Sequence, residues 1–129
     1  MTEALKKRIL VVDDASLVRL YYREALERAG FVVDEAMNGL EAIEKLLLAP
    51  ADLVIVDVNM PKMDGLTFIR NLRGREPSVA SMPALVTSTE GKPEDIEAAR
   101  LAGANFYLVK PIAQDVLADY AAMLCGVSG

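Results

Sequence analysis

Most of the predicted strands in this chain are apolar runs that end at a polar residue. Residues 9–12 (Ile-Leu-Val-Val) and 53–56 (Leu-Val-Ile-Val) contain no polar residue, and each run is followed directly by an aspartate. Runs without polar alternation are typical of strands covered on both faces, as in parallel α/β sheets. The segment 31–36 alternates more and contains Asp34 and Glu35, which indicates an edge strand. Two further runs, at 83–88 and 105–109, end at hydroxyl residues and at a lysine.

Amphipathic patterns separate these strands. Apolar residues recur every three or four positions, which predicts helices over residues 15–29, 40–48, 66–73, 93–102 and 112–124. The stretch 73–81 is polar and interrupted by proline, and there the sequence predicts a loop. Tyr21 and Tyr22 lie in the apolar stripe of the first helix. They could form a stacking platform, but a stripe at helical spacing is more often part of the core.

The alternation of strands and helices predicts an α/β fold. Five strands alternating with five helices call for right-handed βαβ connections and a doubly wound parallel sheet. We expect the flavodoxin-like (βα)5 fold with strand order 2-1-3-4-5, which places strands one and three side by side at the switch point. In this order the carboxyl ends of the two apolar runs meet, and Asp13, Asp14 and Asp57 converge.

Length, charge and cysteine content limit the classes of protein to which the chain could belong. The 129 residues, 53% of them hydrophobic and 26% charged, fit a single domain spanning 1–129, with its core at about 8–124 and no output domain. With 14 basic and 19 acidic residues the net charge is -5, which argues against a nucleic-acid partner. Cys125 is the single cysteine, so the chain cannot form an internal disulfide.

Neither a signal peptide nor a transmembrane segment is predicted. The first eight residues lack the apolar centre of a signal peptide, and no stretch reaches the length of a membrane span. We therefore expect a cytoplasmic protein without membrane contacts. The chain also contains no histidine, which removes the usual neutral-pH base and the commonest transition-metal ligand. Its chemistry must use oxygen ligands, hydroxyl groups and lysine.

Asp57 occupies the position where parallel sheets place their chemistry, beyond the carboxyl end of a buried strand. It could instead cap the next helix, but Asp64 is the better-placed N-cap residue. Three converging carboxylates repel one another and have raised pKa values unless a cation offsets them. A set of oxygen ligands with room for water favours Mg²⁺ over a soft metal.

Thr87 near the end of the fourth predicted strand and Lys110 directly after the fifth complete a site suited to phosphoryl transfer. Lys110 and Mg²⁺ can neutralise phosphoryl oxygens, Thr87 can donate a hydrogen bond, and the Asp57 carboxylate can act as the nucleophile. Each residue also has a purely structural interpretation: Asp14 as a helix cap, Thr87 as a β-branched strand residue and Lys110 as a solvated strand end. Those interpretations do not explain why the residues converge.

Together these motifs resemble the receiver domain of two-component signalling, of the stand-alone type similar to the chemotaxis response regulators. The resemblance covers roughly residues 8–124, and the set of motifs is specific although each one alone is weak. It rests on the paired acids after strand one, the Asp-x-Asn-Met-Pro and Asp-Gly motifs around strand three, the threonine closing strand four and the Tyr-Leu-Val-Lys-Pro motif of strand five: Asp13, Asp14, Asp57, Asn59, Met60, Pro61, Asp64, Gly65, Thr87, Tyr107, Lys110 and Pro111.

The resemblance implies a role for each matched residue. Asp57 would accept a phosphoryl group from a phosphohistidine on a histidine kinase or a histidine phosphotransfer protein. Mg²⁺ would be bound by Asp14, Asp57 and the main-chain carbonyl of Asn59, with Asp13 acting mostly through water. Lys110 would contact the phosphoryl group, and its peptide bond to the following proline would be cis, an isomer that is inexpensive only before proline.

The resemblance also implies a switch. Thr87 would move toward the phosphoryl group and Tyr107 would rotate inward, altering the face formed by residues 93–102, 105–109 and 112–124. That face would bind a downstream target protein, and the chain would be a monomer or a phosphorylation-dependent dimer. Such a protein is a signalling protein and not an enzyme with a separate substrate, although it catalyses its own phosphorylation and dephosphorylation.

Several alternative functions are compatible with these residues. The chain could be a phosphorelay intermediate, a phosphate sink or a receiver-like interaction module that works without phosphorylation. A haloacid-dehalogenase-type phosphohydrolase would want a second acid where Asn59 stands. A flavodoxin-type FMN binder shares the predicted fold, but Asp13 and Asp14 would repel its phosphate.

Overall fold

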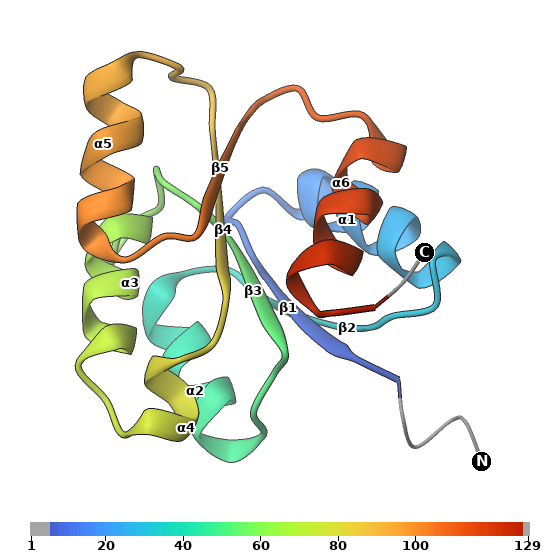
Figure 1. The fold of residues 1–129 in the computed structure, drawn as a ribbon, viewed down its shortest axis with the longest axis horizontal. Coiled ribbons are helices and arrows are strands. Elements are labelled where there is room, and N and C mark those ends of the chain that lie inside the picture. Colours follow the sequence, from blue (N-terminus) through green and yellow to red (C-terminus); the bar gives the residue numbers. More distant parts are fainter. Residues whose placement is uncertain (1–5, 128–129) are drawn as a thin grey trace.

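A parallel five-stranded sheet forms the centre of the computed structural model, which describes residues 6–127 (Figure 1). The strands lie in the order β2-β1-β3-β4-β5, and all four neighbouring pairs are parallel. The strands are β1 (Arg8–Val12), β2 (Val32–Ala36), β3 (Leu53–Asp57), β4 (Ala84–Ser88) and β5 (Phe106–Val109). The helices are α1 (Ser16–Arg28), α2 (Gly39–Leu48), α3 (Gly65–Arg73), α4 (Pro77–Ala80), α5 (Pro93–Ala102) and α6 (Gln114–Leu124).

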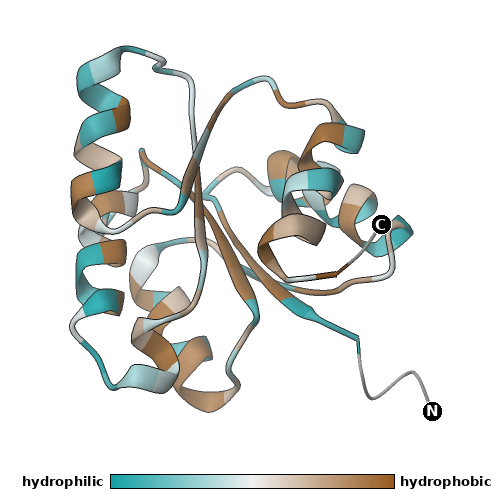
Figure 2. Cartoon of the chain, in the orientation of Figure 1, coloured by the Kyte–Doolittle hydropathy of each residue, from teal (hydrophilic) through white to brown (hydrophobic). Residues whose placement is uncertain are grey.

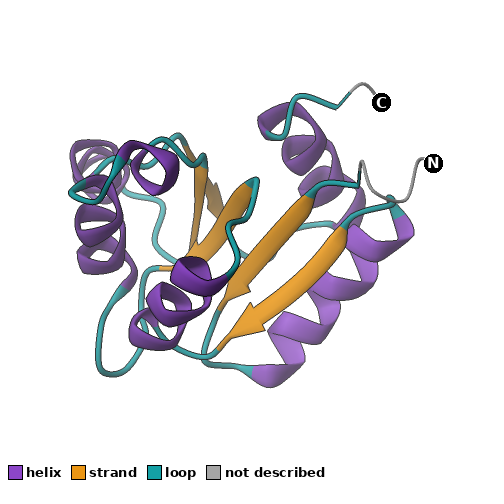
Figure 3. Ribbon diagram, turned by 90° about the horizontal axis from the view of Figure 1, so that it is seen from below, coloured by secondary structure: helices purple, strands orange, loops and turns teal. Residues whose placement is uncertain are grey.

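Helices cover both faces of the sheet, so the fold contains two hydrophobic cores (Figures 1 and 3). Successive residues of a strand point to opposite faces. In β1, Ile9 and Val11 pack with α1 and α6, whereas Leu10 and Val12 pack with α2, α3 and α5. This explains why the central strands are apolar along most of their length, with polar residues only at their ends, as the brown stretches of β1 and β3 in Figure 2 show.

The predicted fold is confirmed, including the strand order and the edge position of β2. The prediction of a loop over residues 73–81 is wrong in part, because α4 forms a short helix there. Pro77 occupies the first turn of α4, where its missing N–H costs nothing, and Val79 is buried in the core. The described part of the chain therefore has six helices where five were expected. None of these helices is both long and apolar enough to cross a bilayer.

The two adjacent tyrosines of α1 occupy different environments. Tyr22 is 3% exposed and belongs to the core, as predicted. Tyr21 is 40% exposed, so its assignment to the core is wrong. Neighbouring residues on a helix point in directions about 100° apart, and only one of the pair can face the sheet. The Tyr21 hydroxyl instead donates a hydrogen bond to the main-chain carbonyl of Ile112, at 2.8 Å.

Candidate functional site

The register of the parallel strands brings the predicted site residues to one edge of the sheet. Val12 of β1 lies opposite Val56 of β3, so the residues that follow them are neighbours. Asp57 in turn lies opposite Thr87 of β4. The site therefore follows from the strand order alone, since parallel strands end at the same edge.

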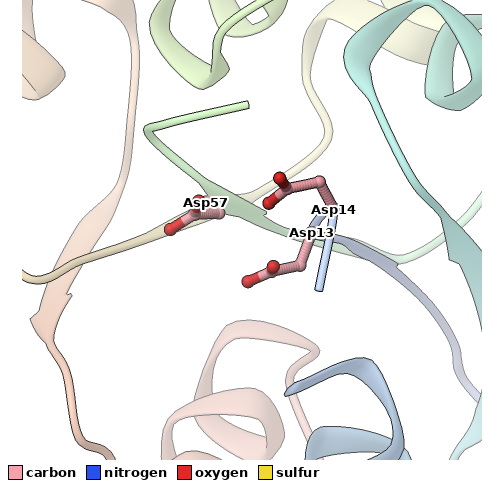
Figure 4. A group of neighbouring side chains, drawn as sticks. All are labelled: Asp13, Asp14 and Asp57. Carbon is pink, nitrogen blue, oxygen red and sulfur yellow. The ribbon is translucent and has the colours of Figure 1, made fainter. Parts of the chain in front are cut away.

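Three carboxylates gather at this edge (Figure 4). Asp13 and Asp14 follow the end of β1, and Asp57 is the last residue of β3. One carboxylate oxygen from each of the three lies within 4.8 Å of the others. Asp13 and Asp57 are buried, at 2% and 7% exposure, whereas Asp14 is exposed. The cluster is thus closed on the protein side and open to solvent beside Asp14.

Lys110 provides a positive charge inside the cluster. Its Nζ atom lies 3.0 Å from Asp13 Oδ2 and 2.9 Å from Asp57 Oδ1. The main-chain N–H of Lys110 donates to the Ser88 carbonyl at 2.7 Å, which ties the residue to the end of β4. The peptide bond from Lys110 to Pro111 is cis, as expected. One lysine faces three carboxylates, so the cluster retains an excess of negative charge.

This imbalance changes the pKa values of the group. Burial raises the pKa of Asp57 above its ordinary value of 3.8, and the Asp13 and Asp14 charges raise it further, while Lys110 only partly opposes the increase. Burial lowers the pKa of Lys110, but the hydrogen bonds to Asp57 and Asp13 and the charges of the same two carboxylates together outweigh burial and raise the pKa above its ordinary value of 10.5. Lys110 is therefore a permanent cation at neutral pH.

The loop after Asp57 is shaped by a glycine. Asp64 caps α3 through a hydrogen bond from the Thr67 N–H to its carboxylate at 2.9 Å, and the Gly65 N–H donates to the Val58 carbonyl at 2.9 Å. A Cβ atom on Gly65 would lie 2.3 Å from the Asp57 carbonyl oxygen. Such a distance is impossible for a side chain, so glycine at this position is what lets α3 start against the end of β3.

The remaining predicted residues surround the cluster. Thr87 is fully buried, and within residues 6–127 its Oγ1 atom has no hydrogen-bond partner. Asn59 lies exposed in the loop two residues after Asp57. Tyr107 is half-buried on β5, and its hydroxyl donates to the Glu90 carbonyl at 2.6 Å. No described contact joins Asn59 or Tyr107 to the three carboxylates.

Arg19 is a site-supporting residue that the sequence pattern missed. Its NH1 group donates to the Asp13 main-chain carbonyl at 2.6 Å, and its Nε atom pairs with Glu35 at 2.8 Å. Arg23 pairs with the second oxygen of Glu35 at 2.6 Å. Periodicity places Arg19 on the polar face of α1 without naming a partner. The sequence feature that could have indicated a partner for Arg19 is the pair of acids inside the edge strand, Asp34 and Glu35, because carboxylates there are expected to pair with cations of a neighbouring helix.

The oxygen donors suit a hard divalent cation. All three clustered side chains are carboxylates, the chain contains no histidine, and the exposed side of the cluster leaves room for water ligands. Mg²⁺ favours such a site, because it binds through one or two carboxylates and retains several waters. The excess negative charge of the three carboxylates attracts a divalent cation and so favours Mg²⁺ binding.

Comparisons with known proteins agree with this geometry. The family model "Response regulator receiver domain" matches residues 9–122. A two-component response regulator of rice (Oryza sativa subsp. japonica) is 39% identical over 114 residues, covering 85% of this chain and 87% of its own length. A protein-glutamate methylesterase/protein-glutamine glutaminase of Archaeoglobus fulgidus is 43% identical over 105 residues, but the match covers 81% of this chain and only 30% of that relative.

The solved structures show the same relationship. The chemotaxis protein CheY4 of Vibrio cholerae superimposes with a TM-score of 0.87 at 33% identity, covering 92% of this chain and 98% of that one. The similarity to the methylesterase is confined to its receiver part. Acidic Mg²⁺-binding pockets and phosphorylation are general properties of such domains. The chain belongs to the response regulator receiver domain family of two-component signalling.

Proposed function

We propose that Asp57 is the phosphoacceptor of this receiver domain. The observation that carries the proposal is the buried Asp57 carboxylate at the end of β3, held 2.9 Å from Lys110 and beside two further carboxylates. A nucleophilic carboxylate needs a nearby cation so that a negatively charged phosphoryl group can approach it. Lys110 is one such cation within the protein, and Mg²⁺ bound at the same cluster would be a second that can serve without it.

The donor would be a phosphohistidine on a histidine kinase or a histidine phosphotransfer protein. An oxygen of Asp57 attacks the phosphorus atom, a P–O bond forms, and the P–N bond breaks with its electron pair returning to the imidazole. Lys110 balances charge on the phosphoryl oxygens, and Thr87 donates a hydrogen bond to one of them. Hydrolysis of the acyl phosphate by water later restores the carboxylate and releases inorganic phosphate.

Asp13, Asp14, Asp57 and the Asn59 main-chain carbonyl would hold Mg²⁺ at the open side of the cluster. When bound, Mg²⁺ supplies Lewis-acid stabilisation of the phosphoryl oxygens. Lys110 pairs with both Asp13 and Asp57, so the exposed Asp14 is the carboxylate of the three that is most available as a direct ligand. Arg19 holds the Asp13 carbonyl and thereby orients the loop that carries both acids.

The output would be a change in the face formed by α5, β5 and α6. Thr87 would move toward the phosphoryl group and Tyr107 would exchange its hydrogen bond to Glu90 for an inward position. The altered face would bind a downstream target protein, and a phosphorylation-dependent dimer is the alternative use of the same face. A phosphorelay or phosphate-sink role requires the same chemistry at Asp57 without such a target. A cytoplasmic location stays a prediction.

Intact-mass measurement with acetyl phosphate and Mg²⁺ tests the proposal. The wild type should gain one phosphoryl group, and the gain should disappear with EDTA and in Asp57→Asn. Asp64→Asn is a matched control, because an asparagine can still cap α3 and the carboxylate lies outside the cluster. A wild type that stays unmodified while a known receiver is phosphorylated would support a phosphorylation-independent interaction module instead.

A further inference from the structure

The loop between β4 and α5 is fixed by contacts at two consecutive residues, Glu90 and Gly91. The main-chain N–H of Glu90 donates a hydrogen bond to Ser88 Oγ at 3.0 Å, and the Tyr107 hydroxyl donates to the Glu90 carbonyl at 2.6 Å. A Cβ atom on Gly91 would lie 3.1 Å from Cγ2 of Val109, so the loop packs directly on β5. The main chain of Glu90 therefore has contacts with two side-chain hydroxyl groups, one on each side.

Ser88 is a rigid anchor for Glu90. It is the last residue of β4 and is only 1% exposed. Its carbonyl accepts a hydrogen bond from the Lys110 N–H at 2.7 Å, which fixes its main chain beside the end of β5. Its hydroxyl accepts from the N–H two residues later, a local turn that serine commonly forms. Glu90 is exposed, so its position depends on these main-chain contacts.

The two hydrogen bonds of Glu90 support each other. Fixing the main chain of an exposed loop residue costs conformational entropy, and this cost is met once for both bonds. When Ser88 already holds the Glu90 N–H, the Glu90 carbonyl is in place to accept from Tyr107. The bond from Tyr107 is therefore stronger with the Ser88 hydroxyl present than without it.

We propose that Ser88 is a positioning residue for Tyr107. Its hydroxyl fixes Glu90 and thereby stabilises the position of Tyr107 in which the phenol hydroxyl binds the Glu90 carbonyl. The inference rests on the proposed function, in which Tyr107 gives up this bond and turns inward on phosphorylation. Ser88 then sets how readily the face formed by α5, β5 and α6 responds.

The direction of the effect follows from comparing the two states. The bond from Glu90 to Ser88 is compatible with both positions of Tyr107, so its own contribution cancels. The support that it gives to the Tyr107 bond exists only in the resting state, and an interaction present in one state shifts the equilibrium toward that state. Ser88→Ala removes this support. The variant should therefore reach the active state more readily and bind a phosphoryl mimic more tightly.

The expected effect is smaller than the contribution of a whole hydrogen bond. A neutral hydrogen bond changes an equilibrium by roughly two- to tenfold, and here only the coupling between two such bonds distinguishes the states. We expect Ser88→Ala to raise the apparent affinity for beryllium fluoride, a phosphoryl mimic, about two- to threefold in the presence of Mg²⁺. Alanine is smaller than serine and adds no atom to this buried position, so the domain should remain folded.

The first experiment is a set of beryllium fluoride titrations with Mg²⁺, followed by amide NMR. Ser88→Ala is measured alone and in the Tyr107→Phe background, where no phenol hydroxyl can bind Glu90. Ser88→Thr keeps the hydroxyl group and should restore the wild-type affinity. Ser81→Ala is the matched control, since it removes a serine hydroxyl that bonds to the Pro77 carbonyl in α4. Thermal unfolding of each variant measures its stability separately.

The second experiment observes Tyr107 without any ligand. Tyrosine is replaced by 3-fluorotyrosine, and the fluorine NMR signal of Tyr107 is identified by its absence from Tyr107→Phe. In the ligand-free protein, Ser88→Ala should move this signal toward its position in the wild type bound to beryllium fluoride. Ser81→Ala should leave the signal unchanged. A general loss of stability would not move one tyrosine signal in this direction.

The inference requires tighter binding by Ser88→Ala, and no effect of the same change in the Tyr107→Phe background. Unchanged or weaker binding by Ser88→Ala overturns it, and so does an equal increase in Tyr107→Phe or in Ser81→Ala. A wild type that does not bind beryllium fluoride with Mg²⁺ contradicts the proposed function. A ligand-free Tyr107 signal that Ser88→Ala leaves unchanged contradicts the inference itself, so the two failures are distinguishable.

Discussion

Removing Lys110 should destabilise the fold in a way that Mg²⁺ partly reverses. In Lys110→Met the carboxylates of Asp13 and Asp57 lose a cation that lies 3.0 Å and 2.9 Å away. Breaking a buried ion pair by removing one partner costs about 3–5 kcal/mol. The lysine side chain is 19% exposed and the cluster opens to solvent beside Asp14, so we expect the lower end, about 3 kcal/mol without metal.

Mg²⁺ should restore part of the stability that Lys110→Met loses. Methionine leaves the carboxylates without a competing cation, so Mg²⁺ binds the variant more tightly than the wild type. A ligand present at ten times its dissociation constant contributes about 1.4 kcal/mol to the free energy of unfolding. Mg²⁺ should therefore stabilise Lys110→Met more than it stabilises the wild type. Urea unfolding followed by far-UV circular dichroism, in EDTA and in excess Mg²⁺, measures both quantities.

The loss of stability in EDTA should also depend on pH. The pKa of Asp57 in the folded protein already lies above 3.8 because of burial, and removing Lys110 raises it further. Between 3.8 and that raised pKa the folded state binds more protons than the unfolded state, so stability falls as pH rises through the interval. The difference between Lys110→Met and the wild type should be largest at neutral pH and shrink as pH falls toward 3.8.

Lys45→Met is the matched control for these measurements. Lys45 pairs with Asp34 at 3.3 Å, but the two side chains are 38% and 45% exposed. Such a surface pair contributes about 0–1 kcal/mol. If Lys110→Met costs no more than Lys45→Met, or if Mg²⁺ stabilises it no more than the wild type, the Lys110 ion pairs do not balance the charge of the cluster and the reasoning is refuted.

Three further substitutions test separate parts of the site. Lys110→Ala, measured at a temperature where it is folded, should still accept a phosphoryl group from acetyl phosphate. It should fail to activate a reconstituted pathway, because it lacks the cation that contacts the phosphoryl group. Normal signalling by this variant would contradict the prediction. Gly65→Ala should lower the free energy of unfolding in urea by about 3–5 kcal/mol, since its Cβ would lie 2.3 Å from the Asp57 carbonyl oxygen. An unchanged free energy of unfolding would mean that the start of α3 shifts easily. Arg19→Met should weaken Mg²⁺ binding about tenfold in calorimetric titration by freeing the Asp13 carbonyl, and unchanged affinity would show that Arg19 only pairs with Glu35.

The parts of the site that could be predicted are those that depend on topology. An apolar run ending in an acid identifies a strand end, and parallel strands place their ends at one edge whatever the side chains do in detail. Asp13, Asp57 and Thr87 were therefore expected together, and the register confirms it. The cis bond after Lys110 came from the family resemblance and not from spacing.

The parts that could not be predicted depend on which of several similar residues of one helix contacts a given partner in the folded protein. Arg19 sits on the polar face of α1, where periodicity treats every charge alike, and its two partners come from β2 and the end of β1. Tyr21 and Tyr22 are equally apolar in a periodicity count, and the helix rotation that buries only one is set by packing against the sheet. The short helix α4 is stabilised by burial of Val79 in the core, a tertiary contact that the local sequence does not show.

The candidate site differs from the rest of the fold in how many of its polar groups are left unbalanced. The two cores bury apolar side chains on both faces of the sheet, while the sheet edge keeps excess negative charge and a Thr87 hydroxyl that has no hydrogen-bond partner among the described residues. Both features reduce the stability of the resting state. Both would be relieved in the proposed active state, the charge by Mg²⁺ and the hydroxyl by a phosphoryl oxygen. A switch requires a ligand that interacts differently with two conformers, and groups left unsatisfied in one conformer provide that difference. Substitutions that satisfied them at rest would stabilise the domain and make it less responsive.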